Sequence, residues 1–522
     1  MSTALSSTEA RFGGSPLNGI RDALEDLGAL LRFRSAALDA KGRRRMRVAG
    51  LAVLLLTVAA AVVPAVSPGA QTGEDVGRLV AIMPSIYLGF LVLAVVSAAA
   101  SGGGREIVPR EQAVAWPVSS MTDHFGALLL APLNIAWLLQ AWTLLGTTAY
   151  VTGHPATLWA TELPVLLYLV LATALGAVVA WLLEWVRRGP RGVLVVRSLL
   201  GVLSASLVAL VLTHHVTDVL DQSPTVWVFV TALNGSVLSW GQWLVGSAVL
   251  LALAVGLVLV GALPARLAAG RAPREEHRLE SGIYEPRPDA LGDLRALVRV
   301  DRVGIWRSLP LRRGLLVLAL MPGLIAFGGQ LGWDRLTILP GLVASGAALL
   351  FGVNTWCLDA RGALWRESLP VAPALAFGSR VWVLTEVLLG AALVTVLLST
   401  LRAGIPTVPE LVALFFATLV VAAQVVSASM RWSVRRPFSV DMRSARATPA
   451  PPVVMVGYST RLALGTTFVG LMFSGLGETD QWHLTALIGL LMVLVSGYRV
   501  ARTASRWEDP ATRARVVVTV AG

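Results

Sequence analysis

The sequence predicts an all-α membrane protein with about twelve transmembrane helices, and three observations lead to this fold class. Hydrophobic residues make up 55% of the 522 residues and charged residues only 14%, whereas soluble domains carry about 25% charged residues. The apolar residues gather into runs of the length that crosses a bilayer as a helix, about 20 residues. Basic residues are concentrated in alternate connecting segments, as expected of a chain that crosses a membrane many times.

Twelve apolar runs have the length of a membrane-spanning helix. They are separated by segments that hold most of the charged residues and prolines. The predicted spans are Ala49–Ser67, Leu79–Ala100, Phe125–Val151, Leu163–Val186, Val193–His214, Val237–Leu263, Gly314–Gln330, Leu339–Leu358, Phe377–Leu401, Val408–Met430, Val453–Leu476 and Leu484–Val500.

The basic residues also predict the orientation of the chain. If both termini are cytoplasmic and the spans alternate, the outer loops contain only Arg78, Arg335 and Arg402 of the 43 basic residues. Cytoplasmic loops are enriched in Lys and Arg, so this orientation is the expected one. The formal net charge of +12 then reflects topology. Because the arginines are scattered over all the inner segments, they do not predict nucleic-acid binding.

The spans divide the chain into two transmembrane halves. A basic, amphipathic N-terminal segment (1–48) precedes the first six-helix half (49–263), and a cytoplasmic linker (264–313) precedes the second (314–500). A cytoplasmic tail (501–522) follows. The dominance of Arg over Lys suggests a GC-rich coding sequence and a bacterial source, so the cytoplasmic membrane is the expected location.

A short internal repeat suggests that the two halves are related. Ala23–Arg32 reads ALEDLGALLR and Ala290–Arg299 reads ALGDLRALVR, with seven of ten positions identical. Both segments are amphipathic, and each precedes a set of six predicted spans. Chance similarity between two segments rich in Leu and Ala is the alternative explanation. Six helices per half preserve the orientation, so the halves are expected to be parallel repeats.

The chain lacks the residues for its own nucleotide or metal chemistry. A P-loop needs a lysine that reaches the phosphates, but the single lysine, Lys41, lies outside any such motif. The single cysteine, Cys357, excludes a C-x-x-C metal site. No Ser-His-Asp set or paired acidic motif stands out. We therefore expect neither an enzyme nor a protein that binds a cofactor or metal itself.

Polar side chains within the predicted spans are candidate transport sites, because ionisable groups are costly in a membrane. Glu386 is compatible with a proton or cation site, but also with a carboxylate that is paired to Arg380 or faces a wet inner cavity. Glu184 is expected to form an interfacial ion pair with Arg187 and Arg188. Amide side chains that either bond neighbouring helices or line a substrate path are Asn134, Gln140, Asn354 and Gln424.

Taken together, these features resemble the membrane-spanning (permease) subunit of a bacterial ABC-2-type ABC exporter with two fused six-helix halves. Pro16–Arg47 resembles the family's connecting helix, and Val216–Ser236 lies where the family has short outer helices. The loops Arg105–Thr122 and Leu358–Ala376 lie where the family has coupling helices. The outer loop Gly477–His483 is very short, which departs from the family pattern and from a symmetric outer gate.

The resemblance implies an exporter driven by a separate pair of ATPase subunits, which would bind the ATP and Mg²⁺. It leaves open whether one chain or two form the pore. Charge reversal at Arg110 or Arg366 is expected to weaken ATPase docking. The coupling-loop residues that this interpretation assigns are Arg105, Glu106, Arg110, Glu111, Asp359, Arg361, Arg366 and Glu367.

A proton-coupled secondary transporter with twelve helices in two halves is the main alternative. Asp359–Gly362 resembles that class's loop signature, but the first-half copy is absent because Ser101–Glu111 has no aspartate. A proton carrier is also expected to have more membrane-embedded acids than Glu386 alone. Loss of activity in Glu386→Gln without any need for ATP would favour this carrier. A membrane transferase acting on lipid-linked substrates is a third class, which the small outer loops disfavour.

Overall fold

The computed structural model describes most of the chain and contains only helices and their connections within the described residues. These residues are 16–36, 40–73, 76–100, 118–133, 135–213, 222–271, 292–328, 331–401, 403–439, 449–450 and 452–522. Among them, six helices are long and apolar enough to cross a membrane, or eight if each of two bent helix pairs is one span. The chain is therefore an all-α, polytopic membrane protein.

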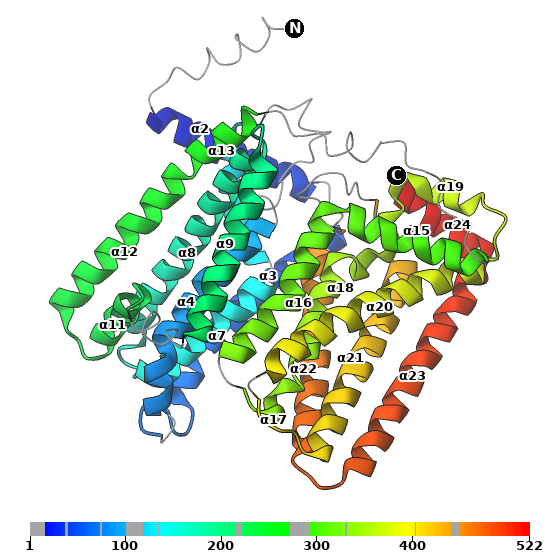
Figure 1. The fold of residues 1–522 in the computed structure, drawn as a ribbon. Helices are drawn as coiled ribbons and strands as arrows, with labels where there is room; N and C mark the ends of the chain where they lie inside the picture. The colour runs from blue at the N-terminus through cyan, green and yellow to red at the C-terminus, as the bar shows by residue number, and fades with distance from the viewer. Residues whose placement is uncertain are drawn as a thin grey trace, which may run out of the picture. The chain divides into compact units, whose positions relative to one another are not determined.

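The helices form two compact units, Met1–Ser281 and Gly282–Gly522 (Figure 1). The boundary between them falls inside the predicted linker 264–313. Each unit has its own buried apolar core.

The first unit is organised around one long helix, α8 (Leu158–Arg187). It packs against α4 (Val76–Ala100), α11 (Thr225–Ser236) and α12 (Trp240–Val260). The core between them is rich in aromatic side chains and includes Tyr87. The other helices of this unit are α2 (Pro16–Ala36), α3 (Ala40–Val62), η2 (Pro64–Val66), α6 (Ser120–Leu130), η3 (Ala131–Leu133), α7 (Ile135–Thr152), α9 (Gly192–Leu212) and α13 (Ala262–Ala269).

The second unit is a bundle in which α21 (Val408–Arg435) packs along α23 (Trp482–Glu508) and α22 (Pro452–Gly477) (Figure 1). Helix α20 (Pro373–Thr400) packs against α16 (Leu309–Gly328). The remaining elements are α15 (Asp293–Arg307), α17 (Trp333–Leu336), α18 (Leu339–Leu350), η4 (Gly352–Leu358), η5 (Ala360–Gly362), α19 (Ala363–Glu367) and α24 (Pro510–Ala521).

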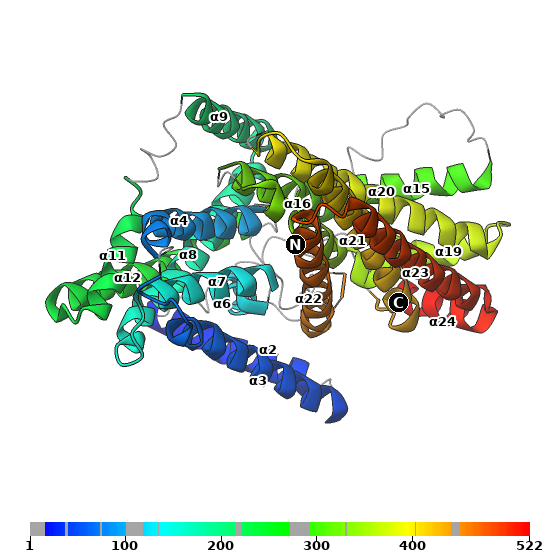
Figure 2. The same ribbon diagram turned by 90° about the horizontal axis from the view of Figure 1, so that it is seen from below.

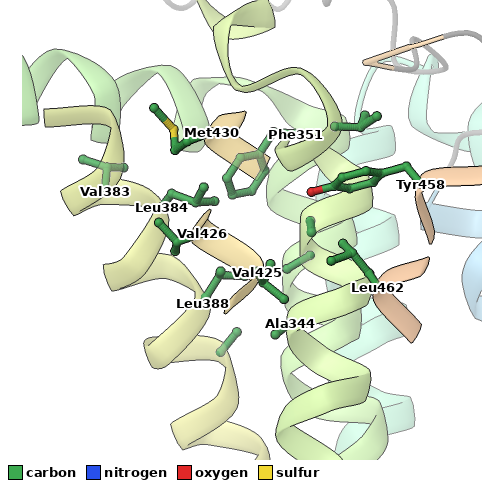
Figure 3. Packing of buried hydrophobic residues seen from close by; sticks show 14 of the residues in the cluster. Ala344, Phe351, Val383, Leu384, Leu388, Val425, Val426, Met430, Tyr458 and Leu462 are labelled. Atoms are coloured by element: carbon green, nitrogen blue, oxygen red, sulfur yellow. The ribbon is translucent and has the colours of Figure 1, made fainter. Parts of the chain in front are cut away.

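The core of the second unit lies where α18, α20, α21 and α22 meet. Figure 3 shows Leu384 and Leu388 of α20 facing Val425 and Val426 of α21, beside Phe351. These side chains are almost fully buried. The small and branched residues allow the helices to approach closely, which is how packing stabilises helices in a bilayer.

Within the described residues each of the twelve predicted apolar runs overlaps a helix, but only six to eight spans have the length and hydropathy to cross a membrane, and several runs are interrupted. The run Phe125–Val151 is broken because α6 ends at Leu130, two residues before Pro132, which cannot donate a helical hydrogen bond. The run Leu339–Leu358 bends by 42° between α18 and η4, where Asn354 has non-helical backbone angles. Helix α8 begins at Leu158, five residues before the predicted start, and this shift brings Glu162 into the helix.

Helix α15 differs from the spanning helices because it carries six charged side chains in fifteen residues. It meets α16 at an angle of 83° and packs against α20. Its buried side chains are Leu297, Val298, Asp301 and Ile305. Helix α15 is therefore an amphipathic helix laid across the end of α20, outside the apolar spans.

Candidate functional site

Four charged side chains are buried together at the N-terminal end of α20. Asp301 of α15 accepts a hydrogen bond from Arg366 Nη1 at 2.5 Å, and its Oδ1 lies 3.1 Å from Arg380 Nη2. Arg380 Nη2 also donates to Asp359 Oδ2 at 2.7 Å. The side chains of Asp301 and Arg380 are only 1% and 3% exposed. Two carboxylates thus balance two guanidinium groups in a nearly dry site.

Hydrogen bonds and charge together keep Asp301 ionised. Ser379 Oγ donates to Asp301 Oδ2 at 2.9 Å. Burial alone would raise the pKa of Asp301, but the nearby Arg380 and Arg366 and the bond from Ser379 outweigh burial, so its pKa lies below its usual value. The pKa of Arg366 is raised, because Asp301 and Asp359 outweigh the effect of its burial. The cluster therefore ties α15, the loop before α20 and α20 itself together as charged partners.

The loop that the sequence predicts as a coupling loop contains the short helix α19, and this helix presents an apolar tip. Leu364 and Trp365 are exposed, the latter by 63%, whereas Ala363 beside them is buried. Arg366, the next residue, enters the charged cluster. Glu367 Oε1 accepts a hydrogen bond from Arg513 Nε of α24 at 2.6 Å. The exposed Leu364 and Trp365 are thus followed by two residues, Arg366 and Glu367, whose ion pairs fix the position of α19.

Helix α24 folds back beside α19 (Figures 1 and 2). At this point the ring of Trp356 stacks on Trp507 with a centroid distance of 4.2 Å and an interplanar angle of 6°. The guanidinium carbon of Arg380 lies 5.2 Å from the centre of the Trp356 ring. A cavity of about 240 Å³ lies beside the stack, with Arg366 and the valines of α24 in its lining.

The structure brings together two of the predicted coupling-loop residues and pairs a third with another helix. Asp359 and Arg366 meet in the buried cluster, and Glu367 pairs with Arg513. The backbone of Arg361 lies in η5, but its side chain is outside the described residues. Because the Arg366 side chain is only 9% exposed, reversing its charge would first disturb this cluster. The predicted residues that lie outside the described part of the chain are Arg105, Glu106, Arg110, Glu111 and Asn134.

Glu386 has a different partner from the one considered in the sequence. Its Oε2 accepts from Arg302 Nη2 of α15 at 2.7 Å, whereas Arg380 is engaged by the two aspartates. Both Glu386 and Arg302 are about half exposed. Glu386 is therefore a second link between α15 and α20 rather than an isolated membrane charge.

The predicted amide side chains have unequal surroundings. Asn354 is fully buried, and its Nδ2 donates to the carbonyl oxygens of Phe438 and Pro449 at 2.8 and 3.1 Å. It therefore bonds backbone that flanks α21 and α22. Gln140 on α7 and Gln424 on α21 are partly buried.

Sequence reasoning missed one acid in the first unit. The predicted span Leu163–Val186 leaves Glu162 just outside the membrane helix, but α8 begins at Leu158 and continues through Pro164. Glu162 is 6% exposed, and within the described residues neither carboxylate oxygen has a hydrogen-bond partner. The apolar Leu158 and Trp159 ahead of Glu162 were the available signal.

Glu184 provides a contrast on the same helix. It is also 6% exposed, but Arg187 and Arg188 each lie 2.9 Å from its carboxylate. The ion pair predicted for Glu184 is therefore confirmed. Two equally buried glutamates on α8 thus differ in whether a cation accompanies them.

Comparison of the chain with models of protein families, with curated proteins and with solved structures finds no match. The functional argument therefore depends on the geometry of the two sites and on the membrane topology.

Proposed function

We propose that the chain is the transmembrane permease subunit of an ATP-driven exporter. It would move a small or amphiphilic substrate across the cytoplasmic membrane while two separate ATPase subunits hydrolyse ATP. The observation that carries this proposal is α19, whose exposed Leu364 and Trp365 stand on a base fixed by buried ion pairs. An exposed aromatic tip on a rigid support is suited to docking into a pocket of a partner.

The proposed topology has twelve spans in two parallel six-helix repeats, with both termini in the cytoplasm. Three features support it: each predicted run overlaps a helix in the described part of the chain, amphipathic helices α2 and α15 precede the two sets, and basic residues concentrate on one side. In this topology α15, α19 and α24 lie on the cytoplasmic side, where a soluble ATPase can reach them. Helix α11 then corresponds to the expected short outer helix.

The buried cluster gives a route from α19 into the membrane helices. Arg366 of α19 is linked to α20 through Asp359, which pairs with Arg380, and to α15 through its pair with Asp301, so force applied to α19 would pass to both helices. Separating buried, mutually neutralising charges is costly, so these segments are expected to move together. Closure of the ATPase pair would thereby shift α20 and change access to the transport path.

Two exposed tryptophans allow a matched test of this proposal. Trp365→Ala removes the tip of α19, whereas Trp382→Ala removes a tryptophan of similar exposure, 60%, from α20, where it would face lipid. We expect Trp365→Ala to reduce the amount of ATPase that co-purifies with the full chain, and Trp382→Ala to leave it unchanged. Equal ATPase recovery from both variants and the wild type would contradict α19 as the docking element.

A proton-coupled carrier is the second candidate, and Glu162 is the observation that favours it. The half-exposed pair of Glu386 and Arg302 supports this candidate less. A carrier would transport without ATP and would stop when the proton gradient is collapsed. A permease would instead lose transport when the partner ATPase is inactivated.

A further inference from the structure

The position of Glu162 on α8 carries its side chain into the core of the first unit. Val165 and Leu169 follow it at spacings of three and seven residues, so all three lie on one stripe of the helix. Both apolar residues are buried in the core cluster that also contains Tyr87 and Phe229. Glu162 therefore faces packed protein rather than lipid or water.

The polar groups around this turn of α8 are already engaged with one another. Tyr87 Oη and Thr148 Oγ1 share a hydrogen bond of 3.0 Å, and Tyr168 Oη donates to the Tyr87 carbonyl at 2.6 Å. Trp243 Nε1 donates to the carbonyl of Ala160 at 2.6 Å. These bonds leave both Glu162 oxygens without a donor in the described structure.

The helices packed on α8 also supply no counter-charge. Helices α11 and α12 contain no titratable side chain. Tyr87 of α4 lies close to Glu162, but a phenol cannot supply a positive charge. The other titratable groups on α8 and its packing neighbours, none of which forms an ion pair with Glu162 in the described residues, are Arg78, Asp123, His124, Tyr150, Tyr168, Glu184, Arg187, Arg197 and Arg266.

An ionised carboxylate in such surroundings is very unfavourable, and a group of this kind takes up a proton instead. We propose that Glu162 is a proton-binding site, with its carboxyl neutral in the described packing and ionised when α8 separates from α4 and α11. The change is the gain or loss of one proton at a carboxylate oxygen. The inference concerns the first unit and does not depend on whether ATP or an ion gradient drives transport.

Helix α11 is the element that ionisation would displace. Gly235 lies so close to α8 that a Cβ added to it would be 2.5 Å from the carbonyl oxygen of Ala160. This contact is two residues from Glu162, and Thr225 of the same helix donates to the carbonyl of Pro84 in α4 at 2.8 Å. Water that hydrates an ionised Glu162 would have to enter this close contact between α11 and α8, which we call the α11–α8 seam. Protonation is therefore coupled to closure of α11 on α8.

Carbodiimide labelling tests the protonation state directly, with Glu184 as the matched control. Dicyclohexylcarbodiimide is apolar and adds the O–H of a protonated carboxyl across its C=N bond. Peptide mass spectrometry of the labelled full chain in mild detergent is expected to find the adduct on Glu162, increasingly at lower pH, and not on the paired Glu184. Adduct on Glu184 at the same rate as on Glu162 would overturn the proposal.

Infrared spectroscopy covers the case in which the reagent cannot reach the site. A protonated carboxyl has its own C=O stretching band, which is expected in the wild type and in Glu184→Gln at neutral pH and lost in Glu162→Gln. A wild type without the band, or a band that survives in Glu162→Gln, would refute the assignment. Neither measurement uses ATP or substrate, so failure here would leave the permease proposal standing.

Discussion

Replacing Asp301 by asparagine should severely destabilise the second unit. The change keeps the size of the side chain but removes the charge that faces Arg366 and Arg380 at 2.5 and 3.1 Å. Asp359 would then be the only carboxylate of the cluster beside two buried guanidinium groups. The cluster would change from neutral to a net charge of +1 in a site that water barely reaches.

The magnitude follows from the burial of these partners. Removing one partner of a buried ion pair costs about 3–5 kcal/mol. Glu386→Gln breaks the half-exposed pair with Arg302 on the same two helices, and exposed pairs contribute about 0–1 kcal/mol. For domains of about this size, 1 kcal/mol corresponds to about 2–4 °C in melting temperature. Asp301→Asn should therefore lower the melting temperature by ~6–20 °C, and Glu386→Gln by less than ~4 °C.

Thermal unfolding of the purified full chain in mild detergent, followed by tryptophan fluorescence, measures this difference. The double variant Asp301→Asn/Arg366→Gln restores neutrality and should recover part of the loss, with a coupling free energy of about 0.5–3 kcal/mol. Equal effects of Asp301→Asn and Glu386→Gln on the melting temperature would refute the reasoning. So would a double variant that loses more stability than its two single changes lose in sum.

Three further predictions concern pH, the aromatic stack and the α11–α8 seam. The folded-state pKa of Asp301 is lowered, so its contribution to stability should be complete above its unfolded-state pKa of about 4 and should be lost as the pH falls through its folded-state pKa. The difference in melting temperature between the wild type and Asp301→Asn should therefore become smaller in acid. A difference that does not change with pH would contradict this prediction. Trp507→Ala should lower the free energy of unfolding by about 3–5 kcal/mol and expose α24 to protease. Trp482→Ala, which changes a more exposed tryptophan on the same helix, should leave the cleavage of α24 unchanged. Equal cleavage rates in the two variants would count against the stack as the anchor of α24. Gly235→Ala should destabilise the first unit because of its contact with Ala160, whereas Gly241→Ala, which meets no atom within 4 Å, should be neutral or stabilising in melting experiments; a neutral Gly235→Ala would argue against a tight seam.

The membrane class of the protein could be predicted from the sequence because it depends on local composition. Runs of about 20 apolar residues are sufficient to indicate spanning helices, and each of them overlaps a helix within the residues that the structure describes. The breaks near Pro132 and Asn354 were harder to predict, because a proline or amide within an apolar run is compatible with either a kink or a break. The structure distinguishes these cases through the backbone at each point.

The charged cluster could be predicted only in part. Asp359 and Arg366 were identified as coupling-loop residues, and Arg380 was noted as a possible partner for Glu386. Asp301 carried no local signal, because it lies on an exposed-looking amphipathic helix and is buried only when α15 packs on α20. Pairing between segments separated by many residues depends on tertiary packing, which a single sequence does not reveal. The same reason explains why Arg302, not Arg380, is the partner of Glu386.

Glu162 was missed for a local reason. The apolar run that predicts this span begins at Leu163, directly after Glu162. The helix instead begins at Leu158 and buries Glu162 one turn inside. The absence of a partner for Glu162 could be recognised only from the packing of α4, α11 and α12 around α8.

The most direct test of the permease proposal is purification of the full chain from its native membrane in mild detergent, followed by mass spectrometry of the proteins that accompany it. The proposal predicts a P-loop ATPase in stoichiometric amount. Its reproducible absence, together with transport that collapses when the proton gradient is removed, would contradict the ATP-driven permease and favour the proton-coupled carrier.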